Sequence, residues 1–227
     1  MHSKDTPHSP LTVLIGVGPA LAKKLEKLGL FSVEDLLFLL PNRYEDRTQL
    51  VKLGALQAGS RCLVTGEVML AEVAFRGRRN LLVRITDGSG QLMLRFFHFS
   101  RAQQKQFQPG VRVTCFGEAR KGSVGLEMIH PEYRVLRQDQ GAAINASLTP
   151  IYPATEGVQQ GRLRNLTDQA LRRMKESPPD ELLPGDIRDK LEMPSLADAI
   201  VYLHRPPPDA DVVRLQAGTH PCQQRLA

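Results

Sequence analysis

Near the middle of the chain lie two segments in which every second residue is apolar, joined by a glycine-rich tetrapeptide. In the first, apolar side chains occupy Leu81, Val83 and Ile85, and a second alternating segment runs from Gln91 to Phe97. A period of two is the pattern of a strand with one buried face. The tetrapeptide Asp87-Gly-Ser-Gly90 between them is typical of a hairpin turn. Because an isolated hairpin is only marginally stable in water, this feature requires further strands nearby.

Three further strands and one short helix are predicted around this hairpin. The strands cover residues 61–70, 111–119 and 125–135, and the polar stretch 100–107 predicts a short helix. Five strands with a helix between the third and the fourth follow the order of an OB-fold, a small Greek-key barrel. We therefore predict an α+β protein with a five-stranded OB-fold.

Short helices are predicted on both sides of the barrel. In the front part, Pro19 opens one helix and Ser32 caps another. In the rear part, prolines separate a helix at 160–175 from a helix that Ser195 caps. We predict three consecutive domains, which are a helix-hairpin-helix-like region at 1–60, the barrel at 61–137 and a Pro-rich helical linker at 138–227.

Positive charge is concentrated in the predicted barrel. Residues 61–137 hold 13 basic and 6 acidic side chains, a balance of +7, whereas the whole chain carries +6. The front segment carries +1 and the rear segment −2. This distribution indicates an anion-facing surface, with nucleic acid as the first candidate. The alternative is a solvated surface on which cations cluster by chance.

The strand that ends at Phe97 is the most informative stretch. Alternation places Phe97 on the same face as Arg95, and the Arg95 guanidinium is expected to avoid the core. An exposed aromatic ring beside a cation on an OB barrel forms a platform on which bases stack. The alternative buries Phe97 and Phe99 under the flanking helices. The positive charge of the segment favours stacking.

An arginine-rich turn is predicted between the first two strands of the barrel. Arg76, Arg78 and Arg79 flank Gly77 and present three guanidinium groups, which suit phosphate contacts. The alternative is a solvated hairpin tip.

A second glycine turn, Gly16-x-Gly18, lies between two short helices at the front of the chain. Small residues there let backbone N–H groups approach a phosphate, with Lys23 and Lys24 nearby as point charges. The alternative is an ordinary tight turn, and Pro19 removes one of the N–H donors.

Several other classes of chemistry lack their motifs in this sequence. The three cysteines and the histidines have no metal-ligand spacing, and no Gly-Lys pair exists from which a Walker A loop could be built. No segment has the length and hydropathy of a membrane span. We therefore assign no catalytic and no metal-binding residue. The cysteine usage indicates a reducing cytoplasm, and a DNA partner would place the protein on the nucleoid.

The chain resembles the N-terminal wedge region of the RecG family of bacterial ATP-dependent DNA helicases, and the resemblance extends through Leu203-His-Arg-Pro-Pro207. The motifs that carry it are Leu14-Ile-Gly-Val-Gly18, Leu28-Gly-Leu-Phe-Ser-Val-Glu-Asp-Leu-Leu37, Pro41-Asn-Arg-Tyr-Glu-Asp-Arg-Thr48, Ile85-Thr-Asp-Gly-Ser-Gly90, Arg95-Phe-Phe97, Gly117-Glu-Ala119, Met128-Ile-His-Pro-Glu-Tyr133 and Leu148-Thr-Pro-Ile-Tyr-Pro-Ala-Thr-Glu-Gly157.

This resemblance implies more than the residues show. RecG proteins remodel replication forks and Holliday junctions in DNA repair and recombination, with an ATP-driven motor that follows the wedge. The wedge is an OB barrel that splits the strands at the branch point. The family's stacking aromatic corresponds to Phe97, and a second aromatic of some members would fall on Arg101. The chain stops before the motor, so we expect no ATPase activity from it alone, and ATP and Mg²⁺ only for full-length members.

We predict a branched-DNA-binding wedge module that acts as a monomer and works with the motor domain of the same protein. The alternative is a scaffold that docks the barrel and the rear helices onto a partner without touching DNA. The predicted DNA-binding residues are Phe96, Phe97, Phe99, Arg76, Arg78, Arg79, Arg95, Arg101, Lys121, Gly16, Gly18, Lys23 and Lys24.

Overall fold

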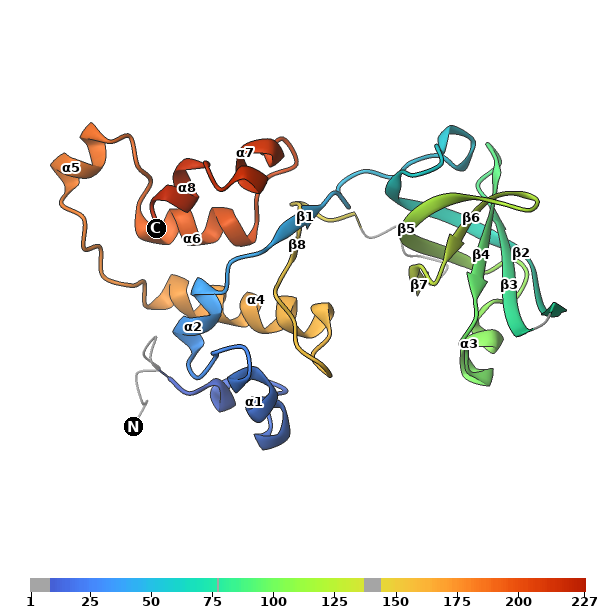
Figure 1. Ribbon diagram of the computed structural model, residues 1–227, viewed down its shortest axis with the longest axis horizontal. Coiled ribbons are helices and arrows are strands. Elements are labelled where there is room, and N and C mark those ends of the chain that lie inside the picture. Colours follow the sequence, from blue (N-terminus) through green and yellow to red (C-terminus); the bar gives the residue numbers. More distant parts are fainter. Residues whose placement is uncertain (1–8, 77, 137–143) are drawn as a thin grey trace. The chain divides into compact units, whose positions relative to one another are not determined.

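The computed structural model describes residues 9–76, 78–136 and 144–227. The chain divides into two compact units (Figure 1). One unit, here the barrel unit, comprises Asp46–Ala146, and the other, the helical unit, comprises Met1–Glu45 together with Ser147–Ala227. The front and rear segments, which the sequence analysis places in separate domains, thus fold together. Residues 46–60 join the barrel, where Leu53 is buried in the core.

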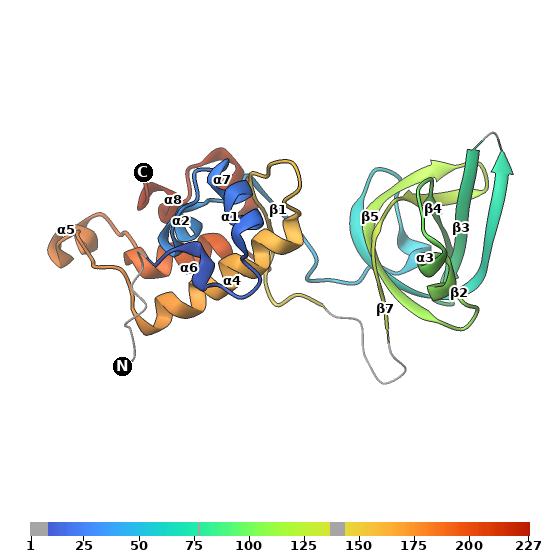
Figure 2. The same ribbon diagram turned by 90° about the horizontal axis from the view of Figure 1, so that it is seen from below.

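The barrel unit contains a closed sheet whose strands curve around one core (Figure 2). Its strands follow the order β2-β3-β4-β6-β5, and β5 pairs back onto β2. The β4–β6 pair is parallel and the other pairs are antiparallel. With a helix between β4 and β5, this is the predicted OB-fold. The elements are β2 (Arg61–Arg76), β3 (Arg78–Thr86), β4 (Gln91–Phe96), α3 (Arg101–Gln106), β5 (Arg112–Gly122), β6 (Gly125–Ile129) and β7 (Glu132–Val135), preceded by the 3₁₀ turn η2 (Leu53–Ala55).

The sheet has six strands where the sequence analysis predicts five. The strand expected over 125–135 breaks at His130, whose φ is 46°, and at Pro131, which has no backbone N–H. The second piece, β7, pairs with the first half of β5 instead of continuing along β4. Conversely, β2 runs to Arg76, well beyond the predicted end at Leu70.

The alternation of the hairpin strands decides which face of the sheet forms the core. Leu81, Val83 and Ile85 on β3 are fully buried, and so are Leu92 and Leu94 on β4. The side chains between them, Leu82, Arg84 and Met93, are partly exposed. The predicted faces are therefore confirmed, and the odd-numbered positions of β4 point outward.

The helical unit is held together by contacts between its front and rear segments. β1 and β8 pair antiparallel, and α2 packs on α4 in one apolar core. Helices this short bury an apolar stripe only against one another, which explains why the two segments fold as one unit. The elements are η1 (Leu11–Val13), α1 (Pro19–Glu26), α2 (Val33–Phe38), β1 (Arg43–Glu45), β8 (Thr149–Ile151), α4 (Gln160–Glu176), α5 (Gly185–Lys190), α6 (Leu196–His204), α7 (Val212–Ala217) and α8 (Pro221–Gln224).

The carboxylate of Asp87 organises the β3–β4 turn. It accepts hydrogen bonds from the backbone N–H groups of Leu53 at 2.9 Å, Ser89 at 2.9 Å and Gly90 at 3.2 Å. Burial opposes its ionisation, but the bonds from the Ser89 side chain and these N–H groups outweigh burial and lower the pKa of Asp87 to about 2. One carboxylate thus ties the hairpin turn to η2.

Replacing Asp87 with alanine should lower the free energy of unfolding by about 1 kcal/mol, because several backbone donors lose a charged acceptor. Urea unfolding at pH 7 measures this change. The pKa of Asp87 is lowered on folding, so its contribution is present above its ordinary pKa of 3.8 and is lost as the pH falls toward 2. Asp180→Ala, at an exposed position in the helical unit, is the control and should leave stability unchanged.

Candidate nucleic-acid interface

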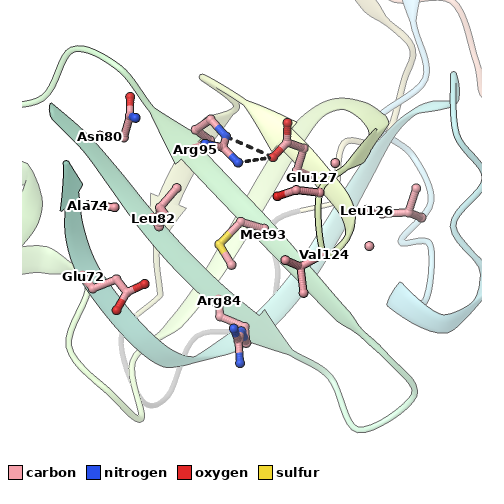
Figure 3. A pocket seen from close by; sticks show the side chains of 13 residues that line it. Glu72, Ala74, Asn80, Leu82, Arg84, Met93, Arg95, Val124, Leu126 and Glu127 are labelled. Atoms are coloured by element: carbon pink, nitrogen blue, oxygen red, sulfur yellow. Dashed lines mark hydrogen bonds and ion pairs between the residues drawn. The ribbon is translucent and has the colours of Figure 1, made fainter. Parts of the chain in front are cut away.

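A groove of about 250 Å³ lies on the outer face of the barrel (Figure 3). Residues of β2, β3, β4 and β6 line it, and the β5–β6 turn contributes Gly122–Gly125. Met93 lies at its centre, between Arg84 and Leu82 of β3 and Val124 of the turn. In OB-folds this outer face and the adjoining loops are the usual place for oligonucleotides. The groove is therefore the first candidate for a nucleic-acid path.

Arg95 lines the groove as predicted, but it is paired. Its Nε and Nη2 groups both donate to Glu127 Oε2, at 3.0 and 2.7 Å. Both side chains are largely buried, at 22% and 13% exposure. Glu72 and Arg84 add one carboxylate and one guanidinium to the lining, so the formal charges of the groove cancel. The predicted phosphate contact by Arg95 would have to use the guanidinium N–H groups that do not donate to Glu127.

Phe97 lies just beyond the end of β4 and is 39% exposed. Its backbone N–H donates to Nε2 of His130 at 3.0 Å, and the two rings lie 5.5 Å apart. His130 reaches this position because its left-handed backbone breaks the last strand. The strand break at His130, which was not predicted, thus positions the side chain that contacts Phe97, the predicted stacking residue.

Of the two neighbouring phenylalanines, Phe96 is a correction to the predicted set. It is 2% exposed and packs against Phe107 and Tyr133, so its ring belongs to the core and has no free face for a base. Phe99 is partly buried, and the Arg79 guanidinium lies 4.7 Å above its ring. Phe96 points inward because it continues the buried positions of β4.

The remaining predicted cations of the barrel are distributed over several elements. Arg79 on β3, Arg101 at the start of α3 and Lys121 on β5 are all exposed. Within the described ranges, none of the three has an acidic partner at ion-pair distance. Gly77 and the side chains of Arg76 and Arg78 fall outside the described part of the structure.

The glycine turn at the front belongs to the helical unit. Gly16 has a φ of 88°, and a Cβ there would lie 2.8 Å from Nη1 of Arg162 on α4. Gly18 caps α1. Gln169 holds the turn by accepting from the Ile15 N–H at 2.8 Å and donating to the Ile15 carbonyl at 3.1 Å. The turn is therefore packed on α4.

Lys23 and Lys24 lie on α1 and are exposed. Lys24 extends toward the loop before α4, where a Cβ on Gly157 would lie 2.6 Å from its Nζ. Neither ammonium group has an acidic partner among the described residues, so both remain candidate phosphate contacts.

Four further residues of the barrel unit were not among the predicted site residues. The first strand was predicted to end before Phe75. In the structure β2 continues past Phe75, whose side chain is 78% exposed. Arg84 and Met93 line the groove, and their outward alternation was a signal that could have identified them. His130 had no signal in the sequence, because its role depends on the backbone break.

Other reactive groups are buried or isolated. Burial raises the pKa of the Cys115 thiol to about 12, so it remains protonated at neutral pH. Among the described residues, no group of three His, Cys, Asp or Glu side chains is arranged to hold a metal ion. None of the helices that the structure describes is long and apolar enough to cross a membrane.

An OB barrel with a grooved outer face, joined to a unit of short helices, defines the class of this protein. The family model of the RecG wedge domain matches residues 10–174. The chain therefore belongs to the RecG wedge domain family.

The relatives are longer proteins. The ATP-dependent DNA helicase RecG of Escherichia coli K12 is 48% identical over 217 residues, which are 96% of this chain and 31% of the relative. The RecG helicase of Pasteurella multocida is 44% identical over the same shares of both chains. A solved structure, RecG bound to a three-way DNA junction, matches all of this chain and 30% of its own, with a TM-score of 0.75 and 25% identity. The chain thus spans about a third of the length of these relatives.

Proposed function

We propose that this chain binds branched DNA as the wedge of a RecG-type helicase and separates strands at the branch point. The observation that carries the proposal is Phe97, a half-exposed ring held by His130 at the end of the strand that lines the groove. Support comes from the relatives, which are named ATP-dependent DNA helicases, and from the RecG structure that was solved bound to a three-way DNA junction. The corresponding cellular role is DNA repair and recombination. The protein would act in the cytoplasm as a monomer.

In this mechanism Phe97 stacks on an exposed base at the branch point, where the base pair has opened. Arg79, Arg101 and Lys121 hold the phosphates of the separated strands, together with the arginine turn at 76–78. Phosphate and stacking contacts carry no base code, so binding selects branched shape rather than sequence. ATP and Mg²⁺ would bind in the two-thirds of the relatives that this chain does not span.

Fluorescence anisotropy with the 227-residue chain tests the proposal. One labelled DNA is a three-way fork with an unpaired gap at the branch, and the other is a linear duplex of equal length. We expect tighter binding to the fork. Equal affinity for both would remove the branch selectivity, and no binding to either would remove the DNA-binding function.

The salt dependence of fork binding should reveal the phosphate contacts. Each lost contact lowers the log–log slope by about 0.7–0.9. The triple replacement of Arg79, Arg101 and Lys121 by alanine should therefore flatten the slope by about 2 to 3, as measured by anisotropy between about 50 and 200 mM salt.

The control removes the same charge from the helical unit. Lys175, Lys190 and Arg214 are exposed cations on α4, α5 and α7. Their triple alanine variant should keep more of the slope than the barrel variant. Equal slopes for the two variants would show that net charge, rather than the barrel surface, determines binding.

Docking onto a partner protein remains a second candidate for the rear helices. Leu182, Leu191 and Val213 are exposed there, at 85%, 53% and 77%. This segment also carries the −2 charge, which disfavours DNA. We propose that these residues contact the motor part of the same protein, while the barrel contacts DNA.

A further inference from the structure

Phe75 is more exposed than any other phenylalanine that the structure describes in the barrel unit. It is 78% exposed, against 39% for Phe97. β2 pairs with β5 only from Arg61 to Glu67, and its second half pairs with β3 alone. Phe75 therefore lies on a two-stranded arm near the β2–β3 tip. Its ring contributes little to the core, so the fold does not explain an aromatic side chain here.

Phe75 has a cation directly across the arm. It pairs in register with Arg79 on β3, so both side chains point to the same face. The Arg79 guanidinium in turn lies 4.7 Å above the Phe99 ring. Phe75, Arg79 and Phe99, here named the tip cluster, combine an exposed ring with a planar cation stacked on a second ring.

The tip cluster and Phe97 lie at the same end of the sheet. Leu81 pairs with Phe96, so the residue after β4 and the residues of β3 before Leu81 are neighbours. Phe97 continues the outward positions of β4, which line the groove through Met93 and Arg95. Phe75 follows Val73, which pairs with the buried Leu81 and packs on the core. The two rings are therefore on opposite faces of one sheet end.

The charge of the tip cluster favours a nucleic acid. Arg79 has no acidic partner in the described parts of the chain, and the acidic side chain nearest along the arm, Glu72, points into the groove on the opposite face. An exposed ring next to an unneutralised guanidinium suits a base and its phosphate, since every base presents a π-face. A duplex buries the faces of its bases, so the matching ligand is an unpaired base.

We propose that the tip cluster is a second stacking site, in which Phe75 receives an unpaired base from one DNA strand while Phe97 receives one from the other. This inference rests on the proposed function. The sheet end then separates the two strands physically, with one aromatic contact on each face. Arg79, already oriented by Phe99, holds the phosphate beside the base on Phe75.

The test uses the whole chain and forks that carry 2-aminopurine, a base whose fluorescence falls when it stacks. One fork carries the probe at the unpaired position of one strand and the second fork at the equivalent position of the other. Phe75→Ala should restore fluorescence on one strand only, and Phe97→Ala on the other. Fork affinity of Phe75→Ala should fall about 5-fold or more.

Two further variants separate stacking from simple apolar contact. Phe75→Trp keeps a π-face and should retain quenching and affinity, whereas Phe75→Leu should lose both. Because the ring is 78% exposed, all three variants should melt like the unchanged chain. A Leu variant that binds and quenches normally would show that apolar contact suffices, and so overturn the stacking site.

The outcomes also separate this inference from the proposal on which it rests. If the unchanged chain binds forks but Phe75→Ala binds and quenches equally well, the second site is wrong and the wedge function stands. If the unchanged chain binds no fork, both are wrong. Loss of quenching on both strands by Phe75→Ala would also contradict the assignment of one ring to each strand.

Discussion

Replacing Phe97 with alanine should weaken binding to a gapped three-way fork by about 5- to 150-fold. Stacking of one base on an aromatic side chain contributes ~1–3 kcal/mol, and this free energy converts to that range of affinity. The ring is 39% exposed and lies outside the barrel core, so its loss should change the melting temperature little. Anisotropy titration and thermal melting of the same variant measure the two effects separately.

Phe38→Ala is the matched control for this prediction. Phe38 ends α2 in the helical unit and is 44% exposed, so the variant removes a ring of similar exposure. It should bind the fork as tightly as the unchanged chain. An unchanged fork affinity of Phe97→Ala would rule out its stacking role, whatever the barrel contributes through charge.

The second large effect concerns His204, the buried histidine of the helical unit. Its Nδ1 lies 2.8 Å from the Tyr152 hydroxyl and its Nε2 lies 2.8 Å from the Leu37 carbonyl. Burial lowers the pKa of His204 to about 4, helped by the charge of Arg205 and opposed by the Leu37 bond. The neutral ring therefore joins α6 to α2 and to the residue after β8.

The helical unit should lose stability as the pH falls from 7 toward 4. The unfolded chain takes up a proton near the ordinary pKa of 6.5, whereas the folded unit does so only near 4. The contribution of the neutral His204 ring to stability is therefore present above pH 6.5. Linkage predicts that the free energy of unfolding falls by about 2 kcal/mol at pH 5. Urea unfolding followed by helical circular dichroism at pH 7.5 and pH 5 measures this difference.

His204→Gln should be less stable at pH 7.5 but should lack most of this pH-dependent loss, because glutamine does not titrate. His98→Gln, at an exposed position, should keep it. An equal loss between the two pH values in His204→Gln and the unchanged chain would assign the effect to other groups.

Local patterns predicted the inner and outer faces of the barrel correctly. The alternation in β3 and β4 is decided by neighbouring residues, and it is sufficient to place Arg95 and Phe97 outward. The same alternation places Phe96 at an inward position of β4, and this argued against Phe96 as a DNA-binding residue. The caps at Ser32 and Ser195 were predicted for the same local reason, and the structure confirms both.

Features that depend on distant residues could not be predicted in this way. The break at His130 places an imidazole ring at the Phe97 N–H, a contact that only the folded barrel shows. The ion pair between Arg95 and Glu127 joins two parallel strands that are far apart in sequence. The front and rear helices form one unit because β1 pairs with β8, and these two strands are separated in the sequence by the whole barrel.

The pairing of β1 with β8 has a consequence for how the chain can be divided. Glu45 and Thr149 are register partners, so the chain leaves the helical unit and returns to it at adjacent positions. The barrel is thus an insertion into a hairpin whose two stems remain hydrogen-bonded. A short turn in its place would close that hairpin, and the barrel could be exchanged for another domain without changing any residue of the helical unit.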